Sequence, residues 1–567
     1  MMVSLRHPEE TFDLVVIGSG AAGLTAALTA AHHGAKVVVL ERGHLWGGTS
    51  ATSGGTIWIP NNHLIAPAGG EDNPADAFRY IRQLAGDDAS AERVQAFVDH
   101  GPRMVRFLAD HSEVQFESLE TYCDYHPELP GGRPGFRSIQ ALPVKCDVLG
   151  RDFETLQPPH LATTAFGRIN WTAKEARPLI TQAKGAKSIF LKIAAKYYLD
   201  IGQRMKTTRD RRITGGGALV TRLKASLNKL KVPVRLSTSL VDYVLENGRV
   251  VGVEVESGGY RQVVRATRGV VVASGGFERN AEMRSAHLPK PTSTDWTGGN
   301  PFNTGAPIAA AMRLGAKMHL LDAAWWAPGY KLADEDRARP MFVERSLPGS
   351  MMVDQSGRRF CNEAASYHVT GGIMAERAAN GGTAPTWFVF DAKFRGKYAL
   401  GPLFPGPPSF DRGVKPTMRA LLKRADTLEE LGKLLGMDAA VFAATVEKFN
   451  ADARAGKDTE FARGESAYDR YYGDDAVQPN PCLAPLEQGP FYAVPILPCD
   501  IGTKGGMLTD VHARVLHEDG SVIEGLYAAG NCAASPMGRS YPAAGATLGP
   551  GMTFGWLAVR HALGVLE

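Results

Sequence analysis

The sequence predicts an α/β protein built on a doubly wound, mostly parallel sheet, and consecutive patterns near the N-terminus carry this prediction. Residues 12–17 (FDLVVI) have the apolar, β-branched character of a buried strand, and the glycine-rich turn 18–23 (GSGAAG) follows them. Residues 24–33 then show the apolar spacing of a helix, and residues 36–41 (KVVVLE) have the pattern of a second buried strand that ends in an acid. Strand, turn, helix and strand make one βαβ unit, the building block of such sheets.

Further strands are expected along the rest of the chain. The apolar and β-branched runs that predict them lie at 234–236, 240–245, 250–255, 269–273, 386–390 and 511–516.

Length and composition favour a large enzyme. The chain has 567 residues, so two or three packed units are expected. Hydrophobic residues make up 44%, charged residues 22%, and the formal net charge is +4, which argues against a disordered chain and against a nucleic-acid binder. Glycine accounts for 63 residues, well above the usual share of about 7%, as expected where the backbone wraps a large cofactor.

The cysteines indicate a reducing compartment. All six are scattered without a C-x-x-C pair, so neither a disulfide framework nor a metal site is predicted. We therefore expect a cytoplasmic protein.

The glycines of the first turn predict a dinucleotide site. In Gly18-x-Gly20-x-x-Gly23, the first glycine permits a tight turn, the second lets the backbone approach a pyrophosphate, and the third allows close helix packing. The N-terminus of the following helix then faces the anion. Glu41, which closes the next strand, is placed to accept hydrogen bonds from ribose hydroxyls.

Three segments, far apart in the chain, favour FAD over NAD as the dinucleotide. The small residues of 47–55 (GGTSATSGG) can line an isoalloxazine ring, which a nicotinamide enzyme does not need. Residues 525–531 (GLYAAGN) have the pattern of a last strand ending in a polar residue. The segment 545–550 (GATLGP) enters a final helix whose N-terminal amides favour negative charge on a reduced flavin.

The order of these segments resembles the fumarate-reductase and succinate-dehydrogenase flavoprotein superfamily. Within it, the chain is most similar to the bacterial 3-ketosteroid Δ1-dehydrogenases, through stretches at 47–60, 125–138, 275–284, 362–367, 461–472, 508–531 and 540–554. The resemblance implies a Rossmann-like FAD-binding domain in two parts, 1–300 and 496–567, around an inserted α+β catalytic domain at 301–495. The segment from about residue 141 to 213 is longer than the matching segment of soluble members and forms an extra insertion. FAD is expected to be non-covalent, because 48–53 holds no histidine.

The motifs and the resemblance together predict a set of cofactor contacts. These are Gly18, Gly20, Ala22, Gly23, Glu41, Arg42, Gly48, Thr49, Ser50, Ser53, Gly54, Gly55, Gly217, Val241, Gly530, Asn531, Ala546 and Leu548.

The resemblance also implies the catalytic residues. Tyr541 and the backbone N–H of Gly545 match the pair that holds the C3 carbonyl of a steroid, where enolate charge develops as a C2 proton leaves. Tyr367 matches the base that takes this proton, and Tyr125 matches a tyrosine that supports the base. The C1 hydrogen would leave as hydride to flavin N5.

Three residues depart from the relatives and are expected to line the substrate pocket. They are Thr56, Tyr122 and Trp326, where relatives carry serine or phenylalanine. Because these residues change the shape of the pocket, the sequence does not indicate how long a C17 side chain the steroid substrate carries.

The resemblance therefore implies 1,2-dehydrogenation of 3-oxo-4-ene steroids, with a quinone-like compound or an artificial dye as electron acceptor. Three alternatives remain. One is a 3-oxosteroid 4(5α)-dehydrogenase. Another is an enoate or dicarboxylate reductase, which would need cationic residues to grip carboxylates. The third is a non-catalytic steroid carrier.

A basic segment within the insertion suggests a further contact. Residues 184–212 carry nine lysines and arginines against two aspartates, with apolar residues at helical intervals, so a basic amphipathic helix is expected over about 189–206. It either contacts a membrane surface, which makes the protein peripherally membrane-associated, or is a solvated helix that covers the insertion.

Overall fold

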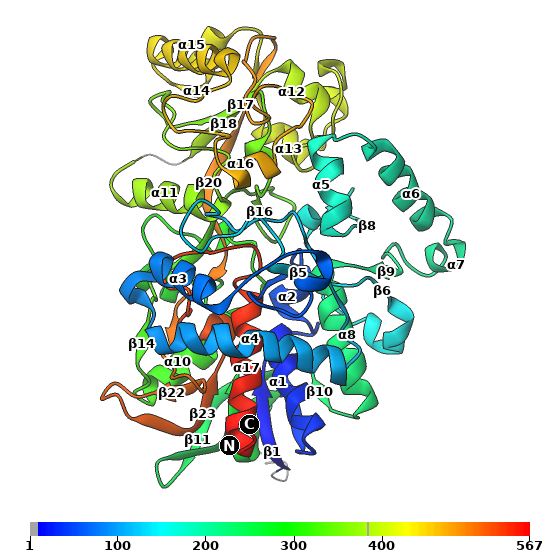
Figure 1. Ribbon diagram of the computed structural model, residues 1–567, viewed down its shortest axis with the longest axis vertical. Coiled ribbons are helices and arrows are strands. Elements are labelled where there is room, and N and C mark those ends of the chain that lie inside the picture. Colours follow the sequence, from blue (N-terminus) through cyan, green and yellow to red (C-terminus); the bar gives the residue numbers. More distant parts are fainter. Residues whose placement is uncertain (1–9, 383–384, 567) are drawn as a thin grey trace.

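The computed structural model describes residues 10–382 and 385–566. Two lobes lie along the long axis, with the strands of one large sheet at the lower end of Figure 1 and those of a second sheet at the upper end. The first and last described elements, β1 (Glu10–Ile17) and α17 (Leu548–Leu563), both lie in the lower lobe.

The lower lobe contains an eight-stranded sheet with the path β10-β2-β1-β13-β12-β11, and β23 and β22 extend it beside β13. Its strands are β1 (Glu10–Ile17), β2 (Val37–Leu40), β10 (Val234–Arg235), β11 (Thr238–Glu246), β12 (Arg249–Ser257), β13 (Tyr260–Val272), β22 (Arg514–Leu516) and β23 (Val522–Ala528). Strand β1 is parallel to β2 and β13, and β23 is parallel to β13. The predicted doubly wound α/β class is confirmed.

Helix α1 (Ala21–His32) joins β1 to β2 and packs against α17 (Leu548–Leu563) and α8 (Gly215–Lys229). Its small side chains let it lie close to the sheet. A Cβ atom on Gly23 would stand 2.0 Å from the Gly18 carbonyl oxygen, so only glycine permits this approach. The predicted first βαβ unit therefore forms as expected.

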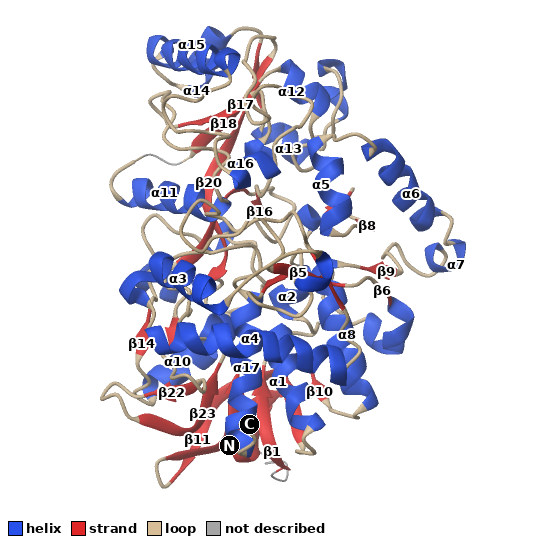
Figure 2. Ribbon diagram, viewed as in Figure 1, coloured by secondary structure: helices blue, strands red, loops and turns tan. Residues whose placement is uncertain are grey.

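The upper lobe is built on a six-stranded sheet ordered β16-β15-β20-β18-β17, with β19 beside β20. Its strands are β15 (Ala324–Tyr330), β16 (Arg339–Pro340), β17 (Ser350–Val353), β18 (Thr386–Phe390), β19 (Lys423–Ala425) and β20 (Phe491–Thr503), shown as red arrows in Figure 2. Helices α11 (Tyr367–Ala379), α14 (Leu428–Leu435) and α15 (Ala439–Ala455) surround it. The expected domain boundary at 495/496 falls inside β20, which runs unbroken from one lobe toward the other.

The insertion projects from the side of the molecule as α5 (Ala173–Thr181), α6 (Ala186–Tyr198) and α7 (Ile201–Arg204) (Figure 1). The single helix expected over about 189–206 is therefore wrong, since the chain forms two helices. The break has a local cause, because the Asp200 side chain accepts from the Gln203 N–H and caps a new helix. Ile193 and Tyr197 are buried against the insertion, as their helical spacing indicated, whereas Ile201 is exposed.

In the ranges 10–382 and 385–566, no helix combines the length and the apolar character that crossing a bilayer requires.

Candidate active site

A cavity of about 380 Å³ runs between the two lobes. One end lies at the carboxyl ends of β1 and β2 and at the N-terminus of α1, where doubly wound sheets bind their ligands. The other end is lined by tyrosines from three separate segments, Tyr122, Tyr367 and Tyr541.

The sheet end of the cavity is a backbone cradle that side chains would fill. A Cβ atom on Gly54 would meet nothing within 4 Å, and one on Gly48 would find its nearest neighbour at 3.8 Å. The space in front of these glycines is therefore open to a ligand. Gly18, at φ +104°, has a different reason to be glycine, because its Cβ would stand 2.4 Å from the Ala273 carbonyl oxygen.

Polar groups in the cradle match a dinucleotide. Glu41 is buried and accepts from the Ser19 hydroxyl at 2.5 Å, the Ser19 N–H at 3.1 Å and the Gly43 N–H at 2.7 Å. Burial raises the pKa of the Glu41 carboxyl, and these hydrogen bonds act in the opposite direction. Helix α1 has no acidic residue in its first turn, so its N-terminus is free to face a pyrophosphate. The cradle therefore fits FAD.

Most of the cofactor contacts expected from the sequence line this cavity. They are Gly18, Gly20, Ala22, Glu41, Arg42, Gly48, Thr49, Ser50, Ser53, Gly54, Gly55, Gly530, Asn531 and Leu548.

Four expected contacts lie elsewhere among the described residues. Gly23 serves helix packing, and Ala546 lines a small adjoining cavity instead. Gly217 and Val241 do not line the main cavity, whereas Gly215 and Leu240, two and one positions away, do. In helix α8 and strand β11 such shifts turn a side chain to another face, which motif spacing alone does not resolve.

The catalytic tyrosines expected from the sequence meet at the far end of the cavity. The ring centroids of Tyr367 and Tyr541 are 5.7 Å apart, and Tyr125 stands 5.6 Å from Tyr367 and 5.1 Å from Tyr541. Tyr367 and Tyr541 line the cavity, whereas Tyr125 does not and lies behind them. A triangle of phenols with two members facing the open space is thus assembled from residues more than 400 positions apart.

The phenol of Tyr541 and the backbone N–H of Gly545 lie next to each other. Burial raises the pKa of the Tyr541 phenol, and hydrogen bonding from Tyr367, Thr547 and the Gly545 N–H acts in the opposite direction. Gly545 sits at φ +97°, and a Cβ there would stand 2.5 Å from the Thr56 carbonyl oxygen. Only glycine fits this turn, which leaves its N–H facing the Tyr541 oxygen.

Hydrogen bonds to backbone carbonyls of the Tyr541 loop tie it to the residues around it. The Tyr125 N–H donates to the Pro542 carbonyl at 2.8 Å, and the Tyr80 hydroxyl donates to the same oxygen at 2.7 Å. The Ser138 hydroxyl donates to the Ala544 carbonyl at 3.3 Å. These contacts hold the two donors of Tyr541 and Gly545 in place before any ligand arrives.

Tyr367 is the first residue of α11, directly after the cap residue Ser366. Burial raises the pKa of its phenol well above the ordinary value, the Tyr541 hydroxyl adds to this increase, and the Tyr125 hydroxyl lowers the pKa. Tyr125 therefore lies where a supporting tyrosine is needed.

Of the three residues assigned to the substrate pocket, Thr56 and Tyr122 line the cavity and Trp326 does not. Its neighbour Trp325 takes that place, with its indole N–H donating to the Asn531 side chain at 3.1 Å. Successive residues of a strand point to opposite sides, so a shift of one position in β15 reverses the assignment.

The insertion also contributes to the cavity, which sequence reasoning missed. The cavity is also lined by Ala176, Arg177 and Ile180 of α5 and by Trp171 just before this helix. No motif in the sequence indicated this, because the resemblance is silent over 141–213.

Comparisons with known proteins agree with this geometry. Residues 13–548 match the family of FAD binding domains. Over 570 residues, the chain is 40% identical to a 3-oxosteroid 1-dehydrogenase of Mycolicibacterium smegmatis, which covers 97% of this chain and 96% of that protein. The chain belongs to the FAD-binding flavoprotein family of the 3-oxosteroid 1-dehydrogenases.

Another relative within this flavoprotein family has a smaller substrate in its name. The 4-oxocyclohexanecarboxylate 2-dehydrogenase of Sinomonas cyclohexanicum is 37% identical over 576 residues, covering 98% of this chain and 94% of that protein. Among solved structures, the 3-ketosteroid Δ1-dehydrogenase of Sterolibacterium denitrificans, in complex with 1,4-androstadiene-3,17-dione, matches with a TM-score of 0.94 at 40% identity, covering 98% of this chain and all of that one. FAD is the cofactor of this flavoprotein.

Proposed function

We propose that this protein is an FAD-dependent 3-oxosteroid 1-dehydrogenase, which converts 3-oxo-4-ene steroids to 1,4-dien-3-ones. The observation that carries the proposal is the meeting of the Tyr367 hydroxyl, the Tyr541 hydroxyl and the Gly545 N–H at the end of the cavity that continues from the FAD cradle. The 40% identity to enzymes with this activity in their names supports it.

Tyr541 and Gly545 supply the electrophilic half of the site. A ketone oxygen placed between the phenol O–H and the backbone N–H accepts two hydrogen bonds. Removing a proton from the carbon beside that ketone builds enolate charge on the oxygen, and both bonds strengthen as the charge appears. The preformed loop makes this stabilisation available without reorganisation.

Tyr367 supplies the base. Its buried phenol does not ionise easily, so the phenolate form needs a hydrogen-bond donor, and Tyr125 stands in that position. The phenolate of Tyr367 accepts the C2 proton, while bound FAD supplies the acceptor for the C1 hydride.

The remaining wall of the cavity suits a fused-ring substrate. Trp171, Phe342 and Ile180 extend the apolar lining beyond the tyrosines. The cation there, Arg177, already donates to the Tyr471 carbonyl at 2.7 Å and lies 3.7 Å from Asp475. A small keto acid would need that cation to be available for its carboxylate, which favours the steroid over 4-oxocyclohexanecarboxylate.

An anaerobic substrate panel tests the proposal. A 4-en-3-one steroid added to the holoenzyme is expected to bleach the flavin and to appear as the 1,4-dien-3-one. A 5α-reduced 3-oxosteroid that returns a 4-ene product would instead indicate 4(5α)-dehydrogenation. Bleaching by 4-oxocyclohexanecarboxylate or succinate but by no steroid would contradict the proposed substrate class.

We also propose that the insertion contacts the surface of an anionic membrane, where such apolar substrates partition. Large apolar side chains are exposed at the C-terminal ends of α6 and α7, where Leu199 is 75% exposed and Met205 is 83% exposed. Exposed lysines on the same two helices and their ends flank this patch: Lys184, Lys187, Lys192, Lys196 and Lys206. Apolar residues that enter the lipid boundary and lysines that pair with lipid phosphates are the two components of interfacial binding.

Vesicle sedimentation tests this contact. The holoenzyme is expected to co-sediment with vesicles that contain phosphatidylserine, less at high salt, and the L199E/M205E variant is expected to stay in solution. L434E is the matched control, because Leu434 is an exposed leucine on α14, far from the insertion. Equal sedimentation of L199E/M205E and L434E would refute the contact.

A further inference from the structure

A buried carboxyl group lies one hydrogen bond behind the wall of the cradle. Glu278 has no exposed surface, and its Oε1 accepts from the side-chain NH2 of Asn303 at 2.6 Å. Its Oε2 accepts from the Thr503 N–H at 3.3 Å. The packing is tight, because a Cβ atom on Gly299 would stand 2.5 Å from Oε1. Asn303 lines the cavity, whereas Glu278 does not and stands behind it.

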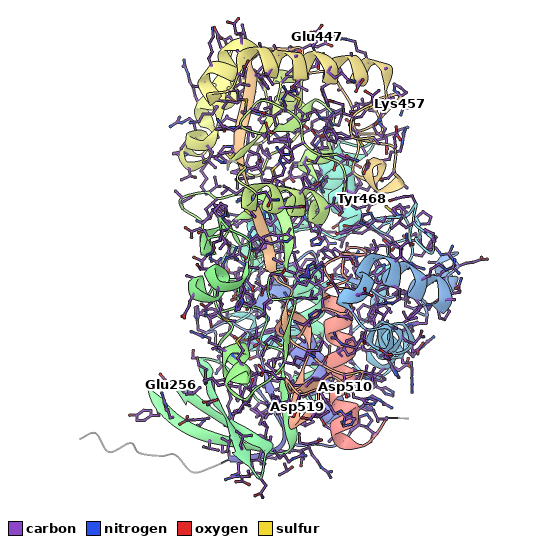
Figure 3. The ribbon with its side chains drawn as sticks, turned by 90° about the vertical axis from the view of Figure 1, so that its left-hand side faces the viewer. Glu256, Glu447, Lys457, Tyr468, Asp510 and Asp519 are labelled. Carbon is purple, nitrogen blue, oxygen red and sulfur yellow. The ribbon has the colours of Figure 1, made fainter. Side chains whose placement is uncertain are left out.

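Three segments meet at this carboxyl group. Glu278 precedes α9 (Ala281–His287), and Asn303 precedes α10 (Ala306–Arg313). Thr503 is the last residue of β20, the pale orange strand of Figure 3 that runs from the upper lobe to the middle of the molecule. The carboxyl group therefore joins the end of this strand to a loop that lines the cradle.

Asn303 passes the contact on to Thr49. The same side-chain NH2 donates to the Thr49 hydroxyl oxygen at 3.1 Å, and the Asn300 N–H donates to that oxygen at 3.1 Å as well. Thr49 belongs to the short helix α2 (Gly48–Thr52) and lines the cradle. In residues 10–382 and 385–566, its hydroxyl donates to no acceptor. A hydroxyl accepts two hydrogen bonds and donates one, so the O–H is left for a ligand in the cradle.

The carboxylate decides the direction of these hydrogen bonds. An ionised carboxylate only accepts, so the Asn303 atom beside it must be the NH2 and not the carbonyl oxygen. The NH2 then donates to Thr49 and leaves the O–H of Thr49 free to turn toward the cradle. A donor in place of the carboxylate would turn the amide over, and the Thr49 O–H would then donate to the amide oxygen.

We propose that Glu278 is a positioning residue for FAD: its carboxylate orients Asn303 so that the Thr49 hydroxyl donates a hydrogen bond to the bound cofactor. A neutral glutamine would be buried at lower cost, so a carboxyl group at this position calls for a reason. The direction of the hydrogen bonds supplies one, because a carboxylate cannot act as a donor. The inference concerns FAD alone and holds whichever substrate the enzyme takes.

Charged groups near Glu278 place its titration close to neutral pH. Burial and the Asp500 carboxylate of β20 raise the pKa of Glu278 to about 7. Arg284 of α9 donates to Asp500 at 2.7 Å and to the backbone carbonyl of Glu278 at 3.2 Å, so its charge is balanced mainly by Asp500. The Arg279 guanidinium donates to backbone carbonyls. Protonation of Oε1 would make it a donor and reverse the hydrogen bonds to Asn303 and Thr49.

A double-mutant cycle on FAD affinity tests the inference. Holoenzyme is diluted at pH 8 without steroid, and the fluorescence of released FAD gives the dissociation constant. Glu278→Gln is expected to raise this constant about tenfold, the loss of one hydrogen bond, and Thr49→Val at least as much. Adding Glu278→Gln to Thr49→Val is expected to change it no further. No effect of Glu278→Gln on the wild type, or the same factor in both backgrounds, would overturn the inference.

The pH dependence of the same constant is a second test, which decides alone if Glu278→Gln does not fold. FAD is expected to bind the wild type about fivefold more weakly at pH 6 than at pH 8, from a tenfold preference for the carboxylate form of Glu278. Thr49→Val is expected to show no such change, because its side chain has no hydroxyl to redirect. A wild-type constant independent of pH, or an equal change in Thr49→Val, would overturn the inference.

Two further variants separate this role from general effects on packing. Thr49→Ser keeps the hydroxyl and is expected to retain the wild-type pH dependence. Glu344→Gln is the matched control, because burial raises the pKa of Glu344 as well, while its side chain accepts from the Val343 N–H at 3.2 Å and does not line the cavity. Its FAD affinity is expected to match the wild type at both pH values. A change as large as that of Glu278→Gln would overturn the inference.

Discussion

Replacing Tyr541 by phenylalanine removes one hydroxyl and leaves the packing of the ring in place. The ring centroid of Tyr541 lies 4.7 Å from Trp325 and 5.1 Å from Tyr125, and phenylalanine preserves both contacts. What is lost is one of two donors aimed at the developing enolate oxygen. Removing a single donor of this kind costs about 3–4 kcal/mol of transition-state stabilisation, a 10²–10³-fold loss of rate.

Stopped-flow measurement of anaerobic flavin bleaching by a 4-en-3-one steroid gives this rate directly. The visible absorbance of the purified variant reports whether FAD is still bound, and we expect full occupancy because Tyr541 lies at the substrate end of the cavity. Bleaching by Tyr541→Phe within about threefold of the wild-type rate would refute the role of this hydroxyl as an enolate donor.

Three further predictions concern the cradle, a buried acid and the support of the site. Gly54→Val is expected to abolish the yellow colour of the purified protein, because the side chain would enter the open cradle, whereas Gly413→Val, where a Cβ also meets nothing within 4 Å, is expected to purify yellow. Burial and Asp500 raise the pKa of Glu278 from 4.5 to about 7, so its contribution to stability is full below pH 4.5 and lost as pH rises through 7. The free energy of unfolding of Glu278→Gln, relative to that of the wild type, should therefore rise by about 3 kcal/mol between pH 4.5 and pH 7 and above. Parallel plots of unfolding free energy against pH for the two proteins would contradict the raised pKa. Tyr80→Phe, which removes the hydrogen bond to the Pro542 carbonyl, is expected to cost about 1 kcal/mol in denaturant unfolding and to slow flavin reduction, and an unchanged rate would show that the loop holds its shape without it.

The fold class could be predicted from the sequence because the pattern that indicates it lies within one short stretch of the chain. In residues 12–41, strand, turn and helix follow one another without interruption, and the glycine spacing marks the turn between strand and helix. The expected helix over 189–206 failed for an equally local reason, since the hydrophobic period continued across Asp200 while this residue offered a cap for a new helix.

The site was less accessible to sequence reasoning. The resemblance of short segments to known proteins predicted Tyr125, Tyr367 and Tyr541. Such a resemblance gives the position of a residue along the chain but not the direction in which its side chain points. Trp325 was missed for Trp326 because adjacent strand residues face opposite sides. The contribution of α5 to the cavity and the hydrogen bond from Asn303 to Thr49 depend on contacts between distant segments. Such contacts have no counterpart in the local pattern.

A single-turnover experiment tests the central claim most directly. Holoenzyme is mixed anaerobically with one equivalent of a 4-en-3-one steroid, quenched, and the steroid is identified by mass spectrometry and chromatography. The account predicts one 1,4-dien-3-one formed per flavin bleached, and almost none from Tyr367→Phe on the same time scale. Recovery of unchanged steroid from the wild type, or an equal yield from Tyr367→Phe, would contradict it.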